Sequence, residues 1–241
     1  MEKIRISKFL SDRGVMSRRA ADGEIEKGNV KVNGTPAQLG QKIDPVTDTV
    51  TVNGKKVGRG DEKVCLVLNK PRGYVTTMHD ERGRKSVSDL VSELGIRVYP
   101  IGRLDRDSEG LLLMTNDGEL ANMLTHPKYH KPKTYDVTVE GKASEEQIER
   151  LGKPFKLDGY ITKPAEVKRF TGDECTTVLQ IKLFEGRNRQ IRRMCETVGL
   201  KVIALKRISI GDINLGKLPT GKWKMLTAEQ IETLKRGNDN A

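Results

Sequence analysis

The chain is poor in aromatic residues and in long apolar runs, and both scarcities exclude classes of protein. Aromatic side chains make up only 4% of its 241 residues, which argues against a protein that binds single strands by stacking on every base. No apolar run approaches the roughly 18 residues of a membrane-spanning helix, and residues 1–5 lack the apolar segment of a signal peptide. We therefore expect a cytoplasmic protein that is not bound to a membrane.

Cysteine and histidine are also scarce, with three residues of each. The cysteines are odd in number and show no CxxC spacing, so we expect reduced, buried thiols. His126 and His130 are four residues apart, but Pro127 between them argues against a helical pair of metal ligands. The sequence therefore predicts no metal site. The three cysteines are Cys65, Cys175 and Cys195.

Positive charge, in contrast, is in excess. The 44 Lys and Arg residues outnumber the 33 Asp and Glu residues and give a formal net charge of +11, which suggests a polyanionic partner. The alternative is a basic surface that is merely solvated. A chain of this length can form one large domain or two ordinary ones, each with its own core.

Residues 1–60 are predicted to form two short helices and several short strands. Apolar residues recur at helical spacing over residues 4–13, and Ser17 has the character of an N-cap for a second helix. Residues 30–34 and 49–54 are short β-branched runs that each end in the turn dipeptide Asn-Gly. The second helix starts with two arginines, where free N–H groups and guanidinium groups would together bind phosphate. The alternative is an ordinary solvated helix face.

Residues 61–236 are predicted to form a second domain, because a polar, glycine-bearing stretch at 58–62 marks a boundary. Strands and helices are mixed here without a regular alternation, which favours an α+β fold with a largely antiparallel sheet. Residues 237–241 are expected to be a loose tail. The expected strands lie at 65–68, 133–139, 179–183, 202–205 and 208–210, and the expected helices begin near Ser86, Asp117, Ser144, Gly186 and Thr227.

The stretch from Tyr99 to Thr115 is charged in its middle and apolar at its end. Asp105 lies just before the apolar run Leu111–Met114, which has the character of a buried strand. A charge placed near a core is costly unless it is paired. The chain therefore has chemical use for this carboxylate, although a turn or cap aspartate is the alternative from pattern alone.

An arginine-rich helix is predicted after Gly186. Successive residues of a helix turn by about 100°, so Arg192 lies at the edge of the apolar stripe centred on Ile191 and is the arginine best placed to pair a buried carboxylate. Arg189 and Arg193 point away, toward phosphate or solvent. On the strand at 133–139, Tyr135 shares a face with valines, where a core tyrosine and a site tyrosine are equally compatible with the pattern.

These pieces together resemble one known family. Residues 102–105 (Gly-Arg-Leu-Asp), followed by 108–113, resemble the central signature of pseudouridine synthases. Lys133–Tyr135 and Glu185–Met194 resemble their later motifs, in the form found in the RsuA/RluB/RluE/RluF type that acts on ribosomal RNA. Residues 1–60 resemble the S4 RNA-binding domain that precedes the catalytic domain in that branch. The motifs occur in the expected order over nearly the whole chain.

The resemblance implies isomerisation of a uridine to pseudouridine in folded RNA, without a cofactor. It implies that Asp105 is the nucleophile, that Tyr135 stacks on the base and relays the proton lost from its C5, and that Arg192 keeps Asp105 ionised. The target base must be extruded from RNA structure, with Arg103 filling the vacated space and Leu104 beside the substrate. The residues expected to bind RNA are Arg5, Lys8, Arg18, Arg19, Lys70, Arg72, Arg187, Arg189 and Arg193.

Two other functions remain open at this point. A non-catalytic protein that binds or assembles ribosomal RNA would leave the set Asp105, Tyr135 and Arg192 unused. An RNA or nucleoside glycosidase would use Asp105 and Asp107 as paired carboxylates, but no distinct acid for the leaving base stands out.

The form of the 188–194 and 215–223 segments favours large-subunit 23S ribosomal RNA over the 16S RNA as the substrate. We expect a monomer. The target uridine, the number of sites modified, and whether the sugar or the base is attacked stay open.

Overall fold

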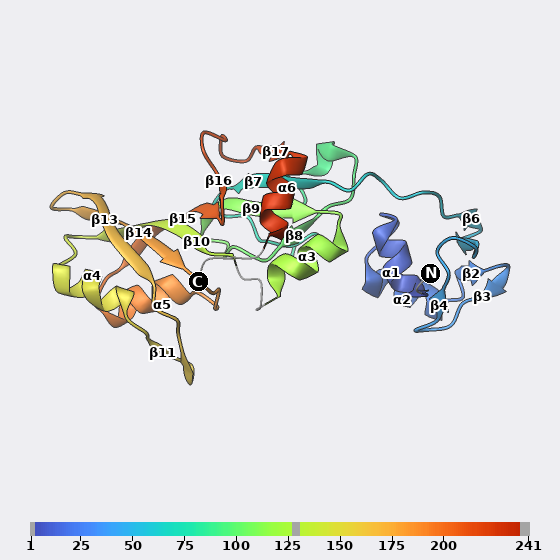
Figure 1. Ribbon diagram of the computed structural model, residues 1–241, viewed down its shortest axis with the longest axis horizontal. Coiled ribbons are helices and arrows are strands. Elements are labelled where there is room, and N and C mark those ends of the chain that lie inside the picture. The colour runs from blue at the N-terminus through green and yellow to red at the C-terminus, as the bar shows by residue number, and fades with distance from the viewer. Residues whose placement is uncertain (1–2, 127–130, 237–241) are drawn as a thin grey trace. The chain divides into compact units, whose positions relative to one another are not determined.

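The computed structural model describes residues 3–126 and 131–236, so His130 and the tail at 237–241 lie outside the described residues. The chain divides into two compact units (Figure 1). The first comprises residues 1–63 with two short segments at 94–97 and 116–118, and the second comprises the rest. Within the described ranges, no helix is both long and apolar enough to cross a membrane.

The first unit contains two helices and short strands around its own core, as predicted. Ser17 caps the second helix, since its Oγ accepts a hydrogen bond from Ala20 N at 3.2 Å. Four of its strands form a sheet in the order β3-β2-β5-β6. Asn33 and Asn53 adopt the left-handed conformation at φ +50° and +49°, as the two Asn-Gly turns require. The elements are β1 Ile4–Arg5, α1 Ile6–Asp12, α2 Arg18–Glu26, β2 Val30–Val32, β3 Thr35–Pro36, β4 Lys42–Ile43, β5 Val50–Val52 and β6 Lys55–Lys56.

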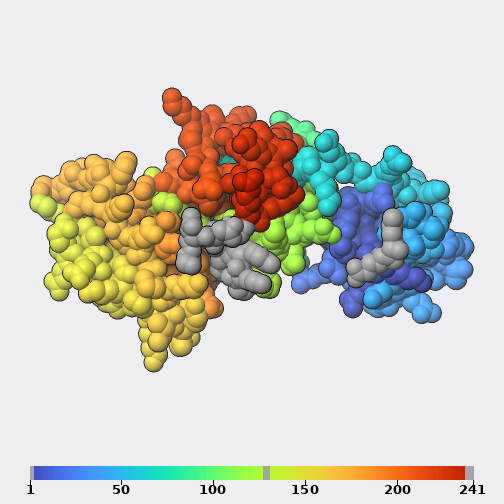
Figure 2. Space-filling view, in the orientation of Figure 1, coloured from blue at the N-terminus to red at the C-terminus, as the bar shows by residue number. Residues whose placement is uncertain are grey.

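The second unit is organised around one mixed sheet, which confirms the predicted α+β class. Its main path runs β13-β14-β10-β15-β9-β7-β17, and every pairing along it is antiparallel except the one between β15 and β9. A small hairpin of β11 and β12 projects from this unit (Figure 2). The strands are β7 Cys65–Lys70, β8 Tyr99–Ile101, β9 Glu109–Thr115, β10 Lys133–Glu140, β11 Lys156–Leu157, β12 Tyr160–Ile161, β13 Glu166–Gly172, β14 Thr176–Leu183, β15 Val202–Ile210, β16 Ile213–Asn214 and β17 Trp223–Met225.

Four helices cover the two halves of this sheet. Leu120 and Leu124 of α3 and Leu234 of α6 share a core with β7 and β9, while α4 contacts β13 and α5 contacts β15 (Figure 1). The helices expected near Ser144 and Thr227 are present as α4 and α6, and each begins with a capping box. The helices are α3 Gly118–Thr125, α4 Glu145–Gly152, α5 Gln190–Thr197 and α6 Ala228–Lys235.

Three predictions about local structure are wrong. The helix expected from Ser86 is a series of turns with one 3₁₀ segment at Ser92–Leu94, because Asp89 bonds the Ser86 amide and Val75 pairs with Ser86 as an isolated bridge. The two strands expected between residues 202 and 210 are one strand, β15. Cys175 is exposed rather than buried, because it lies in the turn between β13 and β14.

The parallel contact between β9 and β15 depends on a glycine. Gly110 pairs with Arg207 and has a φ of +101°, a conformation that side chains rarely adopt. A Cβ atom built at Gly110 would lie 2.3 Å from the Arg207 carbonyl oxygen and 2.8 Å from its nitrogen. The two backbones therefore approach this closely only because residue 110 has no side chain.

Gly110→Ala should destabilise the second unit by about 3 kcal/mol or more, because it adds both backbone strain and a steric clash. Urea unfolding followed by the fluorescence of Trp223, the one tryptophan of the chain, reports on this unit. Gly216→Ala is the matched control, because Gly216 has a φ of +57° but open space around its Cβ position. Gly216→Ala should lower the free energy of unfolding by only about 1 kcal/mol. Equal decreases in the two variants would contradict the role of the close approach between Gly110 and Arg207.

Candidate active site

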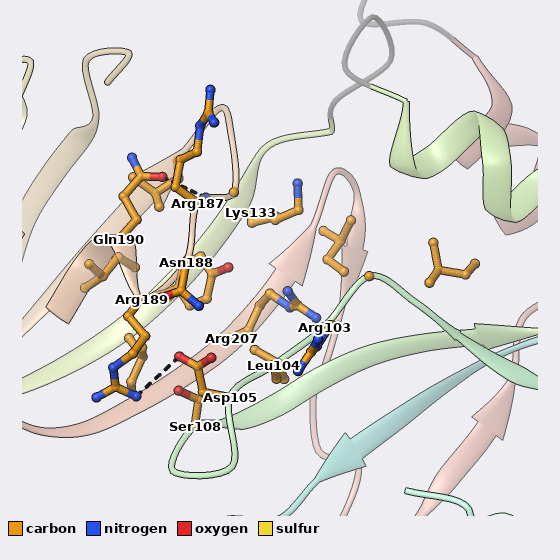
Figure 3. A pocket seen from close by; sticks show the side chains of 18 of the residues that line it. Arg103, Leu104, Asp105, Ser108, Lys133, Arg187, Asn188, Arg189, Gln190 and Arg207 are labelled. Atoms are coloured by element: carbon orange, nitrogen blue, oxygen red, sulfur yellow. Dashed lines mark hydrogen bonds and ion pairs between the residues drawn. The ribbon is translucent and has the colours of Figure 1, made fainter. Parts of the chain in front are cut away.

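A cleft of about 510 Å³ lies in the second unit. It is lined by the loop before β9, by the start of β10, and by the loop before α5 (Figure 3). Three sequence motifs that are far apart in the chain meet here. Asp105, Tyr135 and Arg189 each come from a different one.

The Asp105 loop, residues 102–108, is held by backbone bonds on both sides of the carboxylate. The Thr76 hydroxyl donates to Leu104 O at 2.6 Å and accepts from Leu104 N at 3.2 Å. After Asp105, its carbonyl oxygen accepts from Ser108 N at 3.1 Å, and Arg106 and Gly73 exchange two bonds. The Asp105 side chain is 35% exposed, so a substrate in the cleft can reach it.

Arg189, not Arg192, is the arginine beside Asp105. Arg189 Nη1 lies 3.6 Å from Asp105 Oδ2 (Figure 3). The prediction that Arg192 pairs with Asp105 is wrong, because it extended helical geometry one turn too far. The helix α5 begins at Gln190, and Arg189 stands before it in a left-handed conformation with φ +48°, which turns its side chain back toward the cleft.

Asp107 takes the arginine that the sequence assigned to Asp105. Arg192 Nε lies 3.3 Å from Asp107 Oδ2, and Arg192 Nη2 donates to the Asp107 carbonyl oxygen at 3.1 Å. Arg189 Nη1 also bonds both carboxylate oxygens, at 3.0 and 3.1 Å. Burial acts to raise the pKa of Asp107, but the Arg189 hydrogen bond and the charges of Arg192 and Arg189 outweigh it and leave that pKa lowered. Asp107 is therefore an ionised support for the two arginines.

The loop before α5 is fixed by a buried carboxylate. Glu185 is 5% exposed and accepts bonds from Gln190 Nε2, Lys163 N and the Tyr160 hydroxyl, each at 2.9 or 3.0 Å. Gln190 in turn accepts from Arg187 N at 3.1 Å. Glu185 and Gln190 thus brace the turn that presents Arg189 to the cleft.

The wall of the cleft contains two cross-strand partners. Tyr135 on β10 faces Arg207 on β15, and both line the cleft with exposed fractions of 8% and 3%. Arg207 Nε donates to Leu111 O at 2.7 Å, which ties β15 to the strand that follows the Asp105 loop. Among the described residues its Nη2 has no hydrogen-bond partner.

Two lysines with lowered pKa values lie close to the cleft, Lys70 fully buried and Lys133 half-buried. Lys70, which the sequence assigned to RNA contact, is instead fully buried and donates to Pro71 O and Ser108 O at 3.0 and 2.8 Å. Burial lowers its pKa to about 8, against the charge of Asp105. Lys133 lines the cleft, and burial, with the charge of Arg207, lowers its pKa to about 8 as well. Lys70 therefore supports the Asp105 loop from inside.

The other residues predicted to bind RNA differ in their surroundings. Arg193 makes a bidentate pair with Asp158 at 2.6 and 2.7 Å, and Arg187 lies 3.6 Å over the ring of Tyr160. Both thereby hold the β11–β12 hairpin. The residues whose side chains are open to solvent are Arg5, Arg18, Arg19 and Arg72, while Lys8 is half-buried.

Sequence reasoning missed Thr76, Lys133 and Arg207 as residues of the site. Arg207 carried a signal, because it stands at a buried position of an alternating strand, between Leu205 and Ser209. Thr76 carried none, since its contact is with a loop 28 residues away. In the ranges 3–126 and 131–236, no group of three or more His, Cys, Asp or Glu residues could hold a metal ion. The chemistry available is that of a half-exposed carboxylate beside an arginine.

Comparison with known sequences identifies relatives over nearly the whole chain. The sequence matches the family described as RNA pseudouridylate synthase over residues 64–197 and the S4 domain over residues 4–49. It is 44% identical to the ribosomal large subunit pseudouridine synthase B of Bacillus subtilis, over 96% of this chain and 95% of that one. It is 39% identical to the dual-specificity RNA pseudouridine synthase RluF of Escherichia coli, over 99% of this chain and 80% of that one.

Comparison with solved structures identifies a protein of the same kind as the sequence comparison does. A crystal structure of a pseudouridylate synthase matches with a TM-score of 0.67 and 30% sequence identity, and the match covers 96% of this chain and 99% of that one.

The lowered pKa values of the two lysines predict a pH dependence of stability. Because the pKa of Lys133 falls from 10.5 to about 8 on folding, the folded protein binds fewer protons than the unfolded chain between these values, and its free energy of unfolding rises with pH. One pKa unit is worth about 1.4 kcal/mol, so the full rise from one such lysine is about 3 kcal/mol.

Lys133→Met removes this charge at similar volume and should make the rise across that window shallower. Urea unfolding followed by Trp223 fluorescence measures it. An unchanged slope of the free energy of unfolding against pH would contradict a lowered pKa of Lys133 in the folded protein.

Proposed function

The chain belongs to the RNA pseudouridylate synthase family, and we propose that it isomerises a uridine of ribosomal RNA to pseudouridine. As an RNA pseudouridine synthase it is an isomerase. The observation that carries the proposal is the meeting of Asp105, Tyr135 and Arg189 around one cleft. The large-subunit RNA is the favoured substrate, because the relative in Bacillus subtilis is named for that subunit.

Asp105 is the nucleophile in this proposal. It forms a transient bond to the nucleotide, and the bond between uracil N1 and ribose C1′ breaks. The base then rotates, C5 bonds the same C1′, and the bond to Asp105 breaks, which restores the carboxylate. The C5 proton is lost and N1 gains one, so the reaction consumes no co-reactant. Attack on the sugar and attack on the base give the same balance. Arg189 lies 3.6 Å from the Asp105 carboxylate and offsets its charge, with Arg192 acting through Asp107.

Tyr135 and the residues before Asp105 handle the base. Tyr135 is largely buried in the wall of the cleft, where its ring stacks on uracil and its hydroxyl relays the C5 proton. A base inside folded RNA must leave its stack before Asp105 can reach it. Arg103 is exposed at the mouth of the cleft and fills the vacated space, while the buried Leu104 lines the path of the extruded nucleotide.

RNA binding is shared between the two units in this proposal. The first unit matches the S4 domain, and the exposed Arg18 and Arg19 at the start of α2 bind phosphate there. With its own RNA-binding domain the protein acts as a monomer, in the cytoplasm. Arg72, on the loop after β7, adds a contact near the catalytic cleft.

The two alternative functions are less well supported. A glycosidase would need Asp107 as a protonated acid, but the two arginines lower its pKa and keep it ionised. A protein that only binds RNA would have no use for a cleft with a half-exposed carboxylate.

Asp105→Asn should abolish pseudouridine formation while RNA binding survives, because the amide has similar shape but is not a nucleophile. The substrate is ribosomal RNA isolated from a strain that lacks this protein, and carbodiimide treatment followed by primer extension maps the product. Asp158→Asn, on the β11–β12 hairpin, is the control and should retain turnover. New stops with Asp105→Asn would refute the nucleophile assignment, whereas free uracil with the unmodified protein would indicate hydrolysis.

Thr76→Val should lower kcat with little change in KM. The substitution keeps the shape but removes both bonds to the Leu104 backbone, and a small displacement of a reacting group costs up to about 100-fold in rate. Thr76→Ser retains the hydroxyl and should keep most of the activity. If both variants behaved alike, or if only KM changed, Thr76 would not be positioning the Asp105 loop.

A further inference from the structure

A second cleft, of about 470 Å³, lies against the Asp105 loop. It is lined by residues 75–84 on one side and residues 103–106 on the other. Arg103, Leu104 and Asp105 line both clefts. Any group bound in the second cleft would therefore touch the segment that carries the nucleophile.

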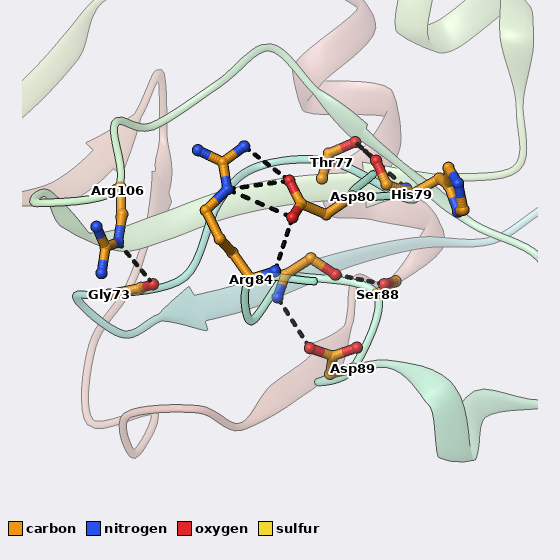
Figure 4. A network of polar contacts seen from close by, with 9 residues as sticks. Gly73, Thr77, His79, Asp80, Arg84, Ser88, Asp89 and Arg106 are labelled. Carbon is orange, nitrogen blue, oxygen red and sulfur yellow. Dashed lines mark hydrogen bonds and ion pairs between the residues drawn. The ribbon is translucent and has the colours of Figure 1, made fainter. Parts of the chain in front are cut away.

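An arginine in this cleft is held in one orientation by a carboxylate (Figure 4). Arg84 Nη2 bonds Asp80 Oδ1 at 2.7 Å, and Arg84 Nε lies 3.2 and 3.3 Å from the two carboxylate oxygens. The Arg84 backbone N–H also donates to Asp80 Oδ2 at 2.7 Å. The Asp80 side chain is 7% exposed, whereas that of Arg84 is 44% exposed. The carboxylate is thus a buried anchor for an accessible guanidinium.

One edge of this guanidinium, at Nη1, does not contact Asp80. Arg84 Nη1 makes no hydrogen bond with the described residues, and in Figure 4 it points away from Asp80. The hydrogen bonds from Arg84 lower the pKa of Asp80 to about 2, so the pair stays charged in ordinary solution. A guanidinium fixed in this way binds an oxyanion at low entropic cost, because its rotamer is already set.

Stability alone does not account for this arginine. The loop is already closed by backbone bonds of Val75 with Lys85 and Val87, each at 2.9 or 3.0 Å. A partly exposed ion pair adds little to the stability of a fold. The chain therefore maintains an oriented cation in a cleft where the backbone does not need it.

The surroundings favour an anionic ligand. Arg82, Arg103 and Arg106 also line the cleft, and all three are exposed. They outnumber the carboxylates Glu81 and Asp105, which leaves the cleft positive once the Asp80–Arg84 pair is set aside.

We propose that Arg84, oriented by Asp80, binds a phosphodiester of the RNA next to the target uridine. The inference rests on the proposed function, because it takes the ligand from the substrate. The phosphates on either side of an extruded nucleotide stay bonded through its ribose, so they must pass close to Asp105. Arg84 holds one of them in the second cleft while the base occupies the first, and so fixes the register of the strand.

Arg84→Gln tests the contact directly. One charged hydrogen bond to phosphate is lost, so KM for the RNA should rise about tenfold or more, with kcat nearly unchanged at saturation. The slope of log affinity against log salt should fall by about 0.7 to 0.9. The substrate is an unmodified transcript of the ribosomal RNA segment in which the wild-type protein forms pseudouridine.

Asp80→Asn separates orientation from simple charge. It adds one net positive charge, so a binding site governed only by total charge would bind the transcript more tightly. If Asp80 acts by orienting Arg84, the variant should instead show a KM raised severalfold, and the double variant with Arg84→Gln should be no worse than Arg84→Gln alone. Tighter binding in Asp80→Asn would overturn the inference.

Matched variants complete the test. Arg84→Lys keeps the charge but cannot bond Asp80 and phosphate in a fixed fork, and it should resemble Arg84→Gln in KM. Lys168→Gln removes an exposed cation on β13, outside both clefts, and should leave KM unchanged. Trp223 fluorescence confirms that each variant is folded.

The experiment distinguishes failure of this inference from failure of the proposed function. Normal product from the wild type with unchanged KM in Arg84→Gln would refute this inference alone. Absence of product from the wild type would refute the proposed function.

Discussion

The site depends on pairing two carboxylates with arginines beside an apolar strand. Asp105 and Asp107 lie just before β9, whose residues 111–114 are at most 1% exposed. Such charges are costly unless they are paired, and the pairing comes from Arg189, the residue just before α5, and from Arg192 within it. The two arginines need a common anchor, and Asp107 provides it. Asp105 can then stay half-exposed with one weaker ion pair, which leaves its oxygens available to a substrate.

This charge arrangement requires that β9 and α5 be brought together, and the sheet does so through β15. The strand β15 lies between β9 and β10, and its crossing with β9 places backbone against backbone at Gly110 and Arg207. The Arg207 side chain also donates a hydrogen bond to Leu111 O. Arg207 therefore holds β15 against β9 through both its main chain and its side chain. Tyr135 is its cross-strand neighbour. The strand β15 therefore ties β9, which follows the Asp105 loop, to β10, which bears Tyr135.

Sequence patterns predicted the regular elements and the members of the site better than the contacts within it. Alternation predicted the strand bearing Tyr135, and cap residues predicted α4 and α6, because these depend on neighbours in the chain. The choice between Arg189 and Arg192 failed, because a left-handed residue before α5 reverses the direction that helical spacing gives. Lys70 looked like a surface lysine, because only the three-dimensional fold shows the two carbonyl groups that hold it inside.

The loop at 75–86 contributes residues that hold both the Asp105 loop and Arg84 in place. Thr76 holds the backbone of Leu104, immediately before Asp105, and Asp80 orients Arg84 only a few residues further along. Thr76 is buried, and so is the Asp80 side chain at 7% exposed, whereas Arg84 is 44% exposed and open to a ligand. In this arrangement the second cleft adds affinity for the strand while Thr76 sets the position of the Asp105 loop, so an RNA that fits only the first cleft would bind less tightly than one that fits both.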